Sequence, residues 1–125
     1  AEFVIEAAPE KLELKQNIIK QNNVNFIAFE VDLDSKNIKD LAFEMGNELE
    51  NLFLVLASKK NNKPSVSCYI SKDLVKLKKY NASKIVKGLS VHIDGSGGGQ
   101  EFFATAGGKK INGIGKLLKM AQSYL

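Results

Sequence analysis

The chain has 125 residues, 44% of them hydrophobic, which suits one domain with its own core. Its single cysteine excludes an internal disulfide and suits a reducing compartment, so we expect a cytoplasmic protein. No apolar run approaches the roughly 20 residues of a membrane helix. The opening stretch AEFVIEAAPEK lacks both the basic region of a signal peptide and an initial methionine. We therefore expect a fragment or a processed product of a longer protein.

The net charge of +4 conceals an asymmetry between the two halves of the chain. Residues 1–58 carry five lysines and eleven acids, a net −6, whereas residues 59–125 carry thirteen lysines and three acids, a net +10. The strongly basic second half favours a polyanionic partner, and nucleic acid is the first candidate. A solvated lysine-rich surface without such a partner would have the same composition. Because there is no arginine, we expect recognition of a nucleic acid to rely on its phosphates, on backbone amides of the protein and on shape, rather than on contacts to base edges.

Residues 1–71 predict three strands, the first two of which alternate with helices. Pro9 favours the first turn of a helix, which we expect to end near Asn22 and Asn23. The stretch NFIAFEVD predicts a strand covered on both faces, and a helix follows with Asp34 or Ser35 as its N-cap. The apolar run NLFLVLAS and the alternating SVSCYIS then predict two strands, which the turn KKNNKP joins into a hairpin.

The second half continues with helices and one further strand. A short helix is expected over residues 73–80, a second one after Asn81 as its cap, and a last one after Asn112. Residues 102–106 predict a short strand. The fold class expected is therefore α/β, a single domain with a roughly four-stranded mixed sheet covered by helices.

The residues that usually carry catalysis are few and scattered. His92 is the only histidine, and we expect it to be half-buried or on a helix surface. Cys68 falls on the apolar face of its strand and is expected to be a buried structural thiol. Asp73, Asp94 and Glu101 are the only acids after residue 58, and their spacing forms no acid–base pair. We predict no catalytic residue, no metal site and no cofactor in this fragment.

The stretch DGSGGGQEFFATAGG, residues 94–108, holds six of the ten glycines. It is not a dinucleotide fingerprint or a P-loop, because Gln100 and Phe103 stand where those motifs need glycine. Three adjacent glycines exceed the need of a tight turn. We therefore expect Gly97–Gly99 to approach a ligand or a neighbouring backbone closely, with Phe102 and Phe103 anchoring the segment in the core.

This segment resembles the G-G-G-x-x-x-x-A-x-G-G signature of the DHH-associated domain. The signature falls on Gly97, Gly98, Gly99, Ala104, Gly107 and Gly108, with one residue more than some members have. The preceding stretch, from NFIAFEVDL to SVSCYISKDL, is similar to the C-terminal domain of alanyl-tRNA synthetases. The resemblance places this domain at residues 25–125 and the end of a linker helix at residues 1–24.

The resemblance implies a non-catalytic module that binds the elbow of tRNA(Ala) and helps to bring aminoacylation and editing onto one tRNA. The implied parent is an alanine–tRNA ligase with ATP and magnesium in its catalytic domain and zinc in its editing domain. Those two domains are implied partners, and in some members the module also supports a homodimer.

Residue Gln100 leaves the choice of parent open. DHH-family phosphodiesterases typically have histidine after the glycine triplet, and alanyl-tRNA synthetases often have arginine. The alternatives are the nucleic-acid-binding domain of such a phosphodiesterase, a free-standing alanyl-tRNA editing protein, or a structural module whose glycines pack against a partner helix.

Loop and helix lysines complete the expected nucleic-acid-binding surface. Those at the hairpin turn and directly after Gly107–Gly108 border apparent loops rather than core, which makes them the better candidates. The predicted binding residues are Gly97, Gly98, Gly99, Gln100, Lys59, Lys60, Lys63, Lys72, Lys76, Lys79, Lys109 and Lys110.

Overall fold

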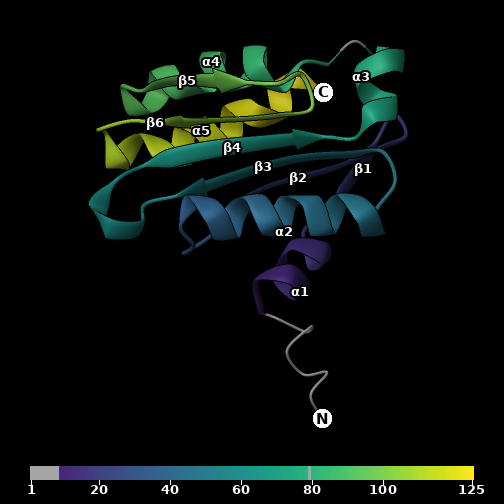
Figure 1. The fold of residues 1–125 in the computed structure, drawn as a ribbon, viewed down its shortest axis with the longest axis horizontal. Helices are drawn as coiled ribbons and strands as arrows, with labels where there is room; N and C mark the ends of the chain where they lie inside the picture. Colours follow the sequence, from purple (N-terminus) through teal and green to yellow (C-terminus); the bar gives the residue numbers. More distant parts are fainter. Residues whose placement is uncertain (1–8, 79) are drawn as a thin grey trace.

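The computed structural model describes residues 9–78 and 80–125, which form a three-layer α/β/α arrangement (Figure 1). Within these residues the five α-helices are α1 (Pro9–Gln16), α2 (Ser35–Glu48), α3 (Lys72–Lys78), α4 (Ala82–Ser90) and α5 (Ile114–Ala121). The six strands are β1 (Ile19–Gln21), β2 (Val24–Glu30), β3 (Leu52–Ser58), β4 (Ser65–Ile70), β5 (Ser96–Gly99) and β6 (Phe103–Gly107). No helix in these two ranges is both long and apolar enough to span a bilayer.

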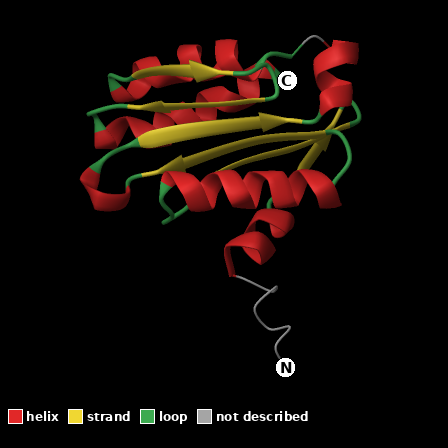
Figure 2. Cartoon of the chain, in the orientation of Figure 1, coloured by secondary structure: helices red, strands yellow, loops and turns green. Residues whose placement is uncertain are grey.

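The strands form one sheet in the order β1-β2-β3-β4-β6-β5 (Figure 2). β2 and β3 are parallel and all other neighbours are antiparallel, so the sheet is mixed as expected. The predicted hairpin of β3 and β4 is confirmed. The expected number of four strands was wrong, because β1 and β5 add an edge strand on each side.

Local backbone conformation explains why β1 was missed. Asn22 and Asn23 have φ of 54° and 65°, and Gln21 pairs with Val24 across them. Two successive positive φ values make a two-residue hairpin turn of the type that asparagine favours. The first helix therefore ends at Gln16, and the chain turns back as a strand instead of continuing as a helix to Asn23.

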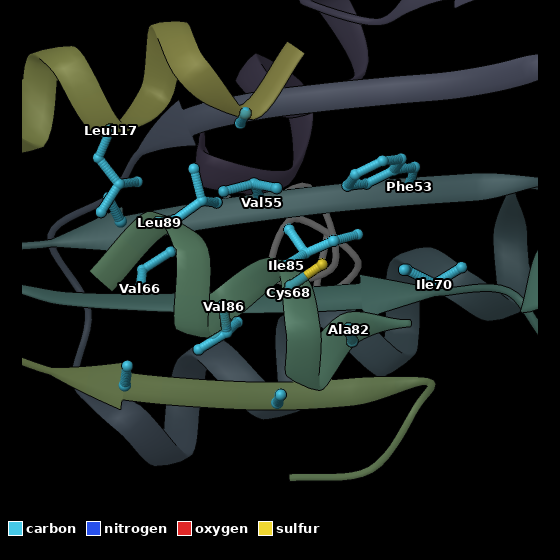
Figure 3. Packing of buried hydrophobic residues seen from close by; sticks show 14 of the residues in the cluster. Phe53, Val55, Val66, Cys68, Ile70, Ala82, Ile85, Val86, Leu89 and Leu117 are labelled. Carbon is cyan, nitrogen blue, oxygen red and sulfur yellow. The ribbon is translucent and has the colours of Figure 1, made fainter. Parts of the chain in front are cut away.

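Two apolar clusters cover the opposite faces of the sheet. α1 and α2 pack on one face, where Leu14, Ile38 and Met45 are fully buried. α4 and α5 pack on the other face, where Leu89 and Leu117 meet alternate residues of β3, β4 and β6 (Figure 3). Every residue of β3 is buried because both faces are covered, which is what its continuous apolar run predicts.

The helix caps follow the sequence at two of three positions. The Asp34 carboxylate accepts a 2.9 Å bond from the Asn37 N–H, and the Asn81 side chain accepts a 3.0 Å bond from the Lys84 N–H. The cap expected at Asn112 was wrong. A 3₁₀ turn covers Ile111–Gly113, and Gly113 is the N-cap of α5.

Within the described residues, one face of β6 and β5 carries no helix. In Figure 1, α4 and α5 lie behind β4, β6 and β5, whereas α2 lies in front of the lower strands of the sheet. Thr105 and Gly107 of β6, which point to the α2 side, are exposed. We call this side of β6 and β5 the open face.

Candidate nucleic-acid interface

Two of the three hairpin lysines and one post-glycine lysine line one pocket of about 440 Å³. Lys60 and Lys63 reach it from the β3–β4 turn, and Lys109 reaches it from the segment after β6. The Gly107–Gly108 pair and the start of β5 complete the wall. We call this the lysine pocket; the sequence predicted these lysines as the better candidates, and the fold brings them together.

Backbone hydrogen bonds hold the two sides of the lysine pocket in place. The Gly108 N–H donates to the Pro64 carbonyl at 2.9 Å, which joins the post-glycine segment to the hairpin turn. The N–H groups of Lys109 and Lys110 both donate to the Ile93 carbonyl, at 2.8 and 2.9 Å. The positions of these lysine backbones are therefore fixed, whereas their long side chains remain free to meet a ligand in solvent.

The charge balance of the lysine pocket leaves a small excess of positive charge. Two carboxylates, Asp34 and Asp94, line it beside the three lysines. Asp34 is already occupied as the N-cap of α2. Lys59, by contrast, does not line the pocket; its Nζ lies 3.6 Å from a Glu30 carboxylate oxygen.

The glycine triplet lies in β5, the last strand of the sheet. A Cβ at Gly97 would collide with the Thr105 carbonyl and the backbone of Ala106, and a Cβ at Gly99 would lie 2.7 Å from the Phe103 carbonyl oxygen. Gly98 faces α4, where a Cβ would lie 3.3 Å from Ser83 Oγ and Lys87 Cε. The expected close approach to a neighbouring backbone thus accounts for Gly97 and Gly99, and contact with nucleic acid stays a prediction.

Sequence reasoning missed two lysines beside the triplet. Lys84 and Lys87 of α4 line a second hollow of about 410 Å³ together with Gly99 and Gln100. Both lysines are exposed, on the side of α4 opposite its buried stripe. Their helical spacing was visible in the sequence, but only the packing of β5 against α4 brings them to the glycines.

The other predicted residues lie elsewhere. Lys72 and Lys76 of α3 line a small hollow with Glu101 and Phe102, apart from the lysine pocket. Lys110 is exposed and is not among the residues that line the pocket. Lys79 lies outside the described residues.

The expectation that Phe102 and Phe103 anchor the segment in the core holds only in part. Phe103 is half-buried and packs against the edge of the apolar cluster on the α2 side of the sheet. Phe102 is also half-buried, but it precedes β6 and lines the small hollow beside α3. They join Phe43 and Tyr69 in an aromatic cluster, with ring centroids 5.3 to 6.5 Å from that of Phe43.

No catalytic constellation is visible in the described part of the chain. Within residues 9–78 and 80–125, no group of three or more His, Cys, Asp or Glu side chains is arranged to hold a metal ion. Cys68 is buried, as predicted, and burial raises the pKa of its thiol far above the usual range. His92 is half-buried in a 3₁₀ turn, also as predicted.

Comparison with known proteins gives a family and a set of relatives. The model of the DHHA1 domain matches residues 23–125. The chain is 48% identical over 115 residues to the alanine–tRNA ligase of Christiangramia forsetii, a match that covers 92% of the chain and 13% of the ligase. It is 40% identical over 121 residues to the alanine–tRNA ligase of Flavobacterium psychrophilum, covering 93% of the chain and 14% of that protein. The chain thus spans about one seventh of these curated relatives.

Two solved structures share the fold. The C-Ala domain of Aquifex aeolicus alanyl-tRNA synthetase superposes with a TM-score of 0.69 at 22% identity, covering 82% of this chain and 89% of that one. The DHH domain of a member of the s1p family of ribosomal proteins gives a TM-score of 0.55 at 14% identity, covering 99% of this chain and 32% of that one. The fold and the family match agree with the resemblance carried by the glycine signature. The chain therefore belongs to the DHHA1 domain family, and over the matched segment it is homologous to alanine–tRNA ligases.

Proposed function

We propose that this chain is a tRNA-binding module of an alanine–tRNA ligase and that it has no catalytic activity of its own. The observation that carries the proposal is the lysine pocket, where Lys60, Lys63 and Lys109 meet beside the Gly107–Gly108 pair. Ammonium groups on fixed backbones suit the phosphates of a folded RNA, which supply most of the affinity in such complexes. Homology to alanine–tRNA ligases supports tRNA(Ala) as the ligand that we propose.

The finer parts of the proposal concern the parent protein. We expect the module to bind the tRNA elbow and to help the catalytic and editing domains of the same chain to act on one tRNA. ATP and magnesium would then belong to the catalytic domain, zinc to the editing domain, and the parent to the cytoplasm. A homodimer is a further expectation. The 48% identity to an alanine–tRNA ligase favours this parent over a DHH-family phosphodiesterase or a free-standing editing protein.

A binding titration tests the proposal directly. The 125-residue chain is titrated with a tRNA(Ala) transcript, with other tRNAs and with single-stranded DNA of matched length. We expect binding of tRNA to be tighter than binding of the DNA, because the shape of the folded RNA sets where its phosphates lie. Equal affinity for all three ligands would instead indicate a nonspecific basic surface.

A further inference from the structure

The aromatic cluster lies on the open face, outside the lysine pocket. Phe43 of α2 is 37% exposed, and its ring packs edge-on against Tyr69 at 5.3 Å and Phe103 at 5.5 Å. The edge of the sheet area that α2 covers lies at these rings. The rings of Phe43 and Phe103 therefore border solvent rather than another helix. Large aromatic side chains that stay accessible to solvent are characteristic of surfaces that stack nucleobases.

The position of Phe43 is supported from below by Tyr69. Gly46 lies inside α2, where glycine is unfavourable, and a Cβ at that position would collide with the Tyr69 ring. The absence of a side chain lets Tyr69 lie flush against the helix. The cluster is therefore held by packing, and the exposed ring of Phe43 is pre-oriented.

Lys39 lies beside the rings of Phe43 and Phe103. Lys39 Nζ lies 6.0 Å from the centroid of Phe43 and 5.9 Å from that of Phe103, within reach of a cation–π contact. An apolar protein partner on these rings would have to bury this ammonium group without a counter-charge, which is costly. A nucleotide brings both complements, a base for the rings and a phosphate for the lysine.

The open face connects this cluster to the lysine pocket. Three successive cross-strand pairs of β4 and β6 point to the α2 side: Ser65 with Gly107, Ser67 with Thr105, and Tyr69 with Phe103. The first pair lines the lysine pocket and the last pair belongs to the aromatic cluster. The distance between them is roughly 14 Å at the usual rise per strand residue. Between them lies the exposed side chain of Thr105, whose Oγ1 accepts a 3.2 Å bond from the buried Ser67 Oγ.

We propose that Phe43 and Phe103 form a stacking site for an unpaired base of the bound RNA, with Lys39 on the phosphate of that nucleotide. The inference rests on the proposed function, because the same RNA would extend across the open face from the lysine pocket. It adds a base-binding subsite to a surface that otherwise contacts phosphates alone.

A single tryptophan can report on this site. The chain has no tryptophan, so Phe43→Trp keeps an aromatic ring and adds one fluorophore. The probes are an RNA hairpin with an unpaired loop and the same hairpin with abasic loop positions, which preserves every phosphate. We expect the intact hairpin to quench the tryptophan and the abasic hairpin to leave it unquenched and to bind about 5- to 150-fold more weakly.

The matched variant Phe43→Leu keeps an apolar side chain but removes the ring. We expect it to lose a similar factor in affinity for the intact hairpin with an unchanged salt dependence. If both hairpins bind equally and the tryptophan stays unquenched, the stacking site is rejected while the proposed function stands. If Phe43→Leu changes the oligomeric state in sedimentation and leaves RNA affinity intact, the cluster is a protein contact and the inference is wrong. If neither hairpin nor tRNA binds, the proposed function itself fails.

Discussion

Gly108 donates its backbone N–H to the carbonyl oxygen of Pro64 at 2.9 Å, and this bond joins the glycine pair to the lysine-bearing hairpin turn. A Cβ at Gly108 would collide with the Ile93 carbonyl, the same group that accepts from the N–H groups of Lys109 and Lys110. Gly108 therefore lets two segments that are distant in sequence approach closely enough for their lysines to line one pocket.

The two kinds of glycine in the triplet should respond differently to alanine. Gly97→Ala places a methyl group against the backbone of β6, so we expect a loss of about 1–3 kcal/mol in the free energy of unfolding. Gly98→Ala meets only the ends of the Ser83 and Lys87 side chains, and we expect a change within about 0.5 kcal/mol. Urea unfolding of both variants checks this. Equal losses would show that β5 is not packed as described.

Partial burial should make Phe103 less important to stability than a core phenylalanine. Phe53 is fully buried and packs edge-to-face on Phe26 at 5.2 Å, so Phe53→Ala should cost about 3–5 kcal/mol. Phe103 is only half-buried, and we expect Phe103→Ala to cost about half as much. Denaturant unfolding of both variants in parallel gives the comparison. A loss at Phe103 that matched the loss at Phe53 would place Phe103 in the core after all.

Burial of Cys68 predicts a fall in stability at high pH. Because burial raises the thiol pKa, the folded chain keeps the proton above about pH 9, where the unfolded chain releases it. The unfolded state then binds fewer protons, so the free energy of unfolding decreases as pH rises, by up to about 1.4 kcal/mol per pH unit. Unfolding at pH 8 and pH 10 should show a steeper fall for the native chain than for Cys68→Ala. Parallel curves would mean that the thiol ionises in the folded state.

The isolated chain should be catalytically inert. We expect no alanine-dependent exchange between ATP and pyrophosphate and no hydrolysis of mischarged tRNA or of phosphodiesters. Turnover by a pure preparation, abolished by a substitution within this chain, would contradict the proposed role.

Strand β5 shows where prediction of the fold from sequence fails. Gly97–Gly99 have no side chains to pack, so neither strand propensity nor alternation marks them. Their strand conformation comes from pairing with β6 and from packing against α4, which are tertiary contacts. The apolar pattern of β3 and β4, in contrast, predicted both strands and their hairpin. Their side chains are buried on covered faces of the sheet, and burial requires the apolar residues that are visible in the sequence.

The candidate site was also predictable only in part. Residues Lys60, Lys63 and Lys109 flank turn signals, and this placed them in loops. The sequence did not show that the hairpin turn lies beside the Gly107–Gly108 pair, which the fold brings about. Lys87 gave no such signal, because its place beside Gly98 depends on how α4 lies under β5. Phe43 was hidden for a similar reason, since the apolar pattern of α2 does not show where the helix stops covering the sheet.

The central claim is that lysines of the lysine pocket contact RNA phosphates, and the salt dependence of tRNA binding tests it most directly. If the three lysines of the pocket and one to three further exposed lysines contact phosphates, log K should fall against log salt with a slope of about −3 to −5. Replacing Lys63 and Lys109 by alanine should reduce the magnitude of that slope by about one to two. It should also lower the affinity for all tRNAs by a similar factor. The matched control replaces the exposed Lys116 and Lys119 of α5, removes the same charge and should leave the slope near its original value. An unchanged slope in the Lys63/Lys109 variant, or an equal reduction in the control, would contradict the claim.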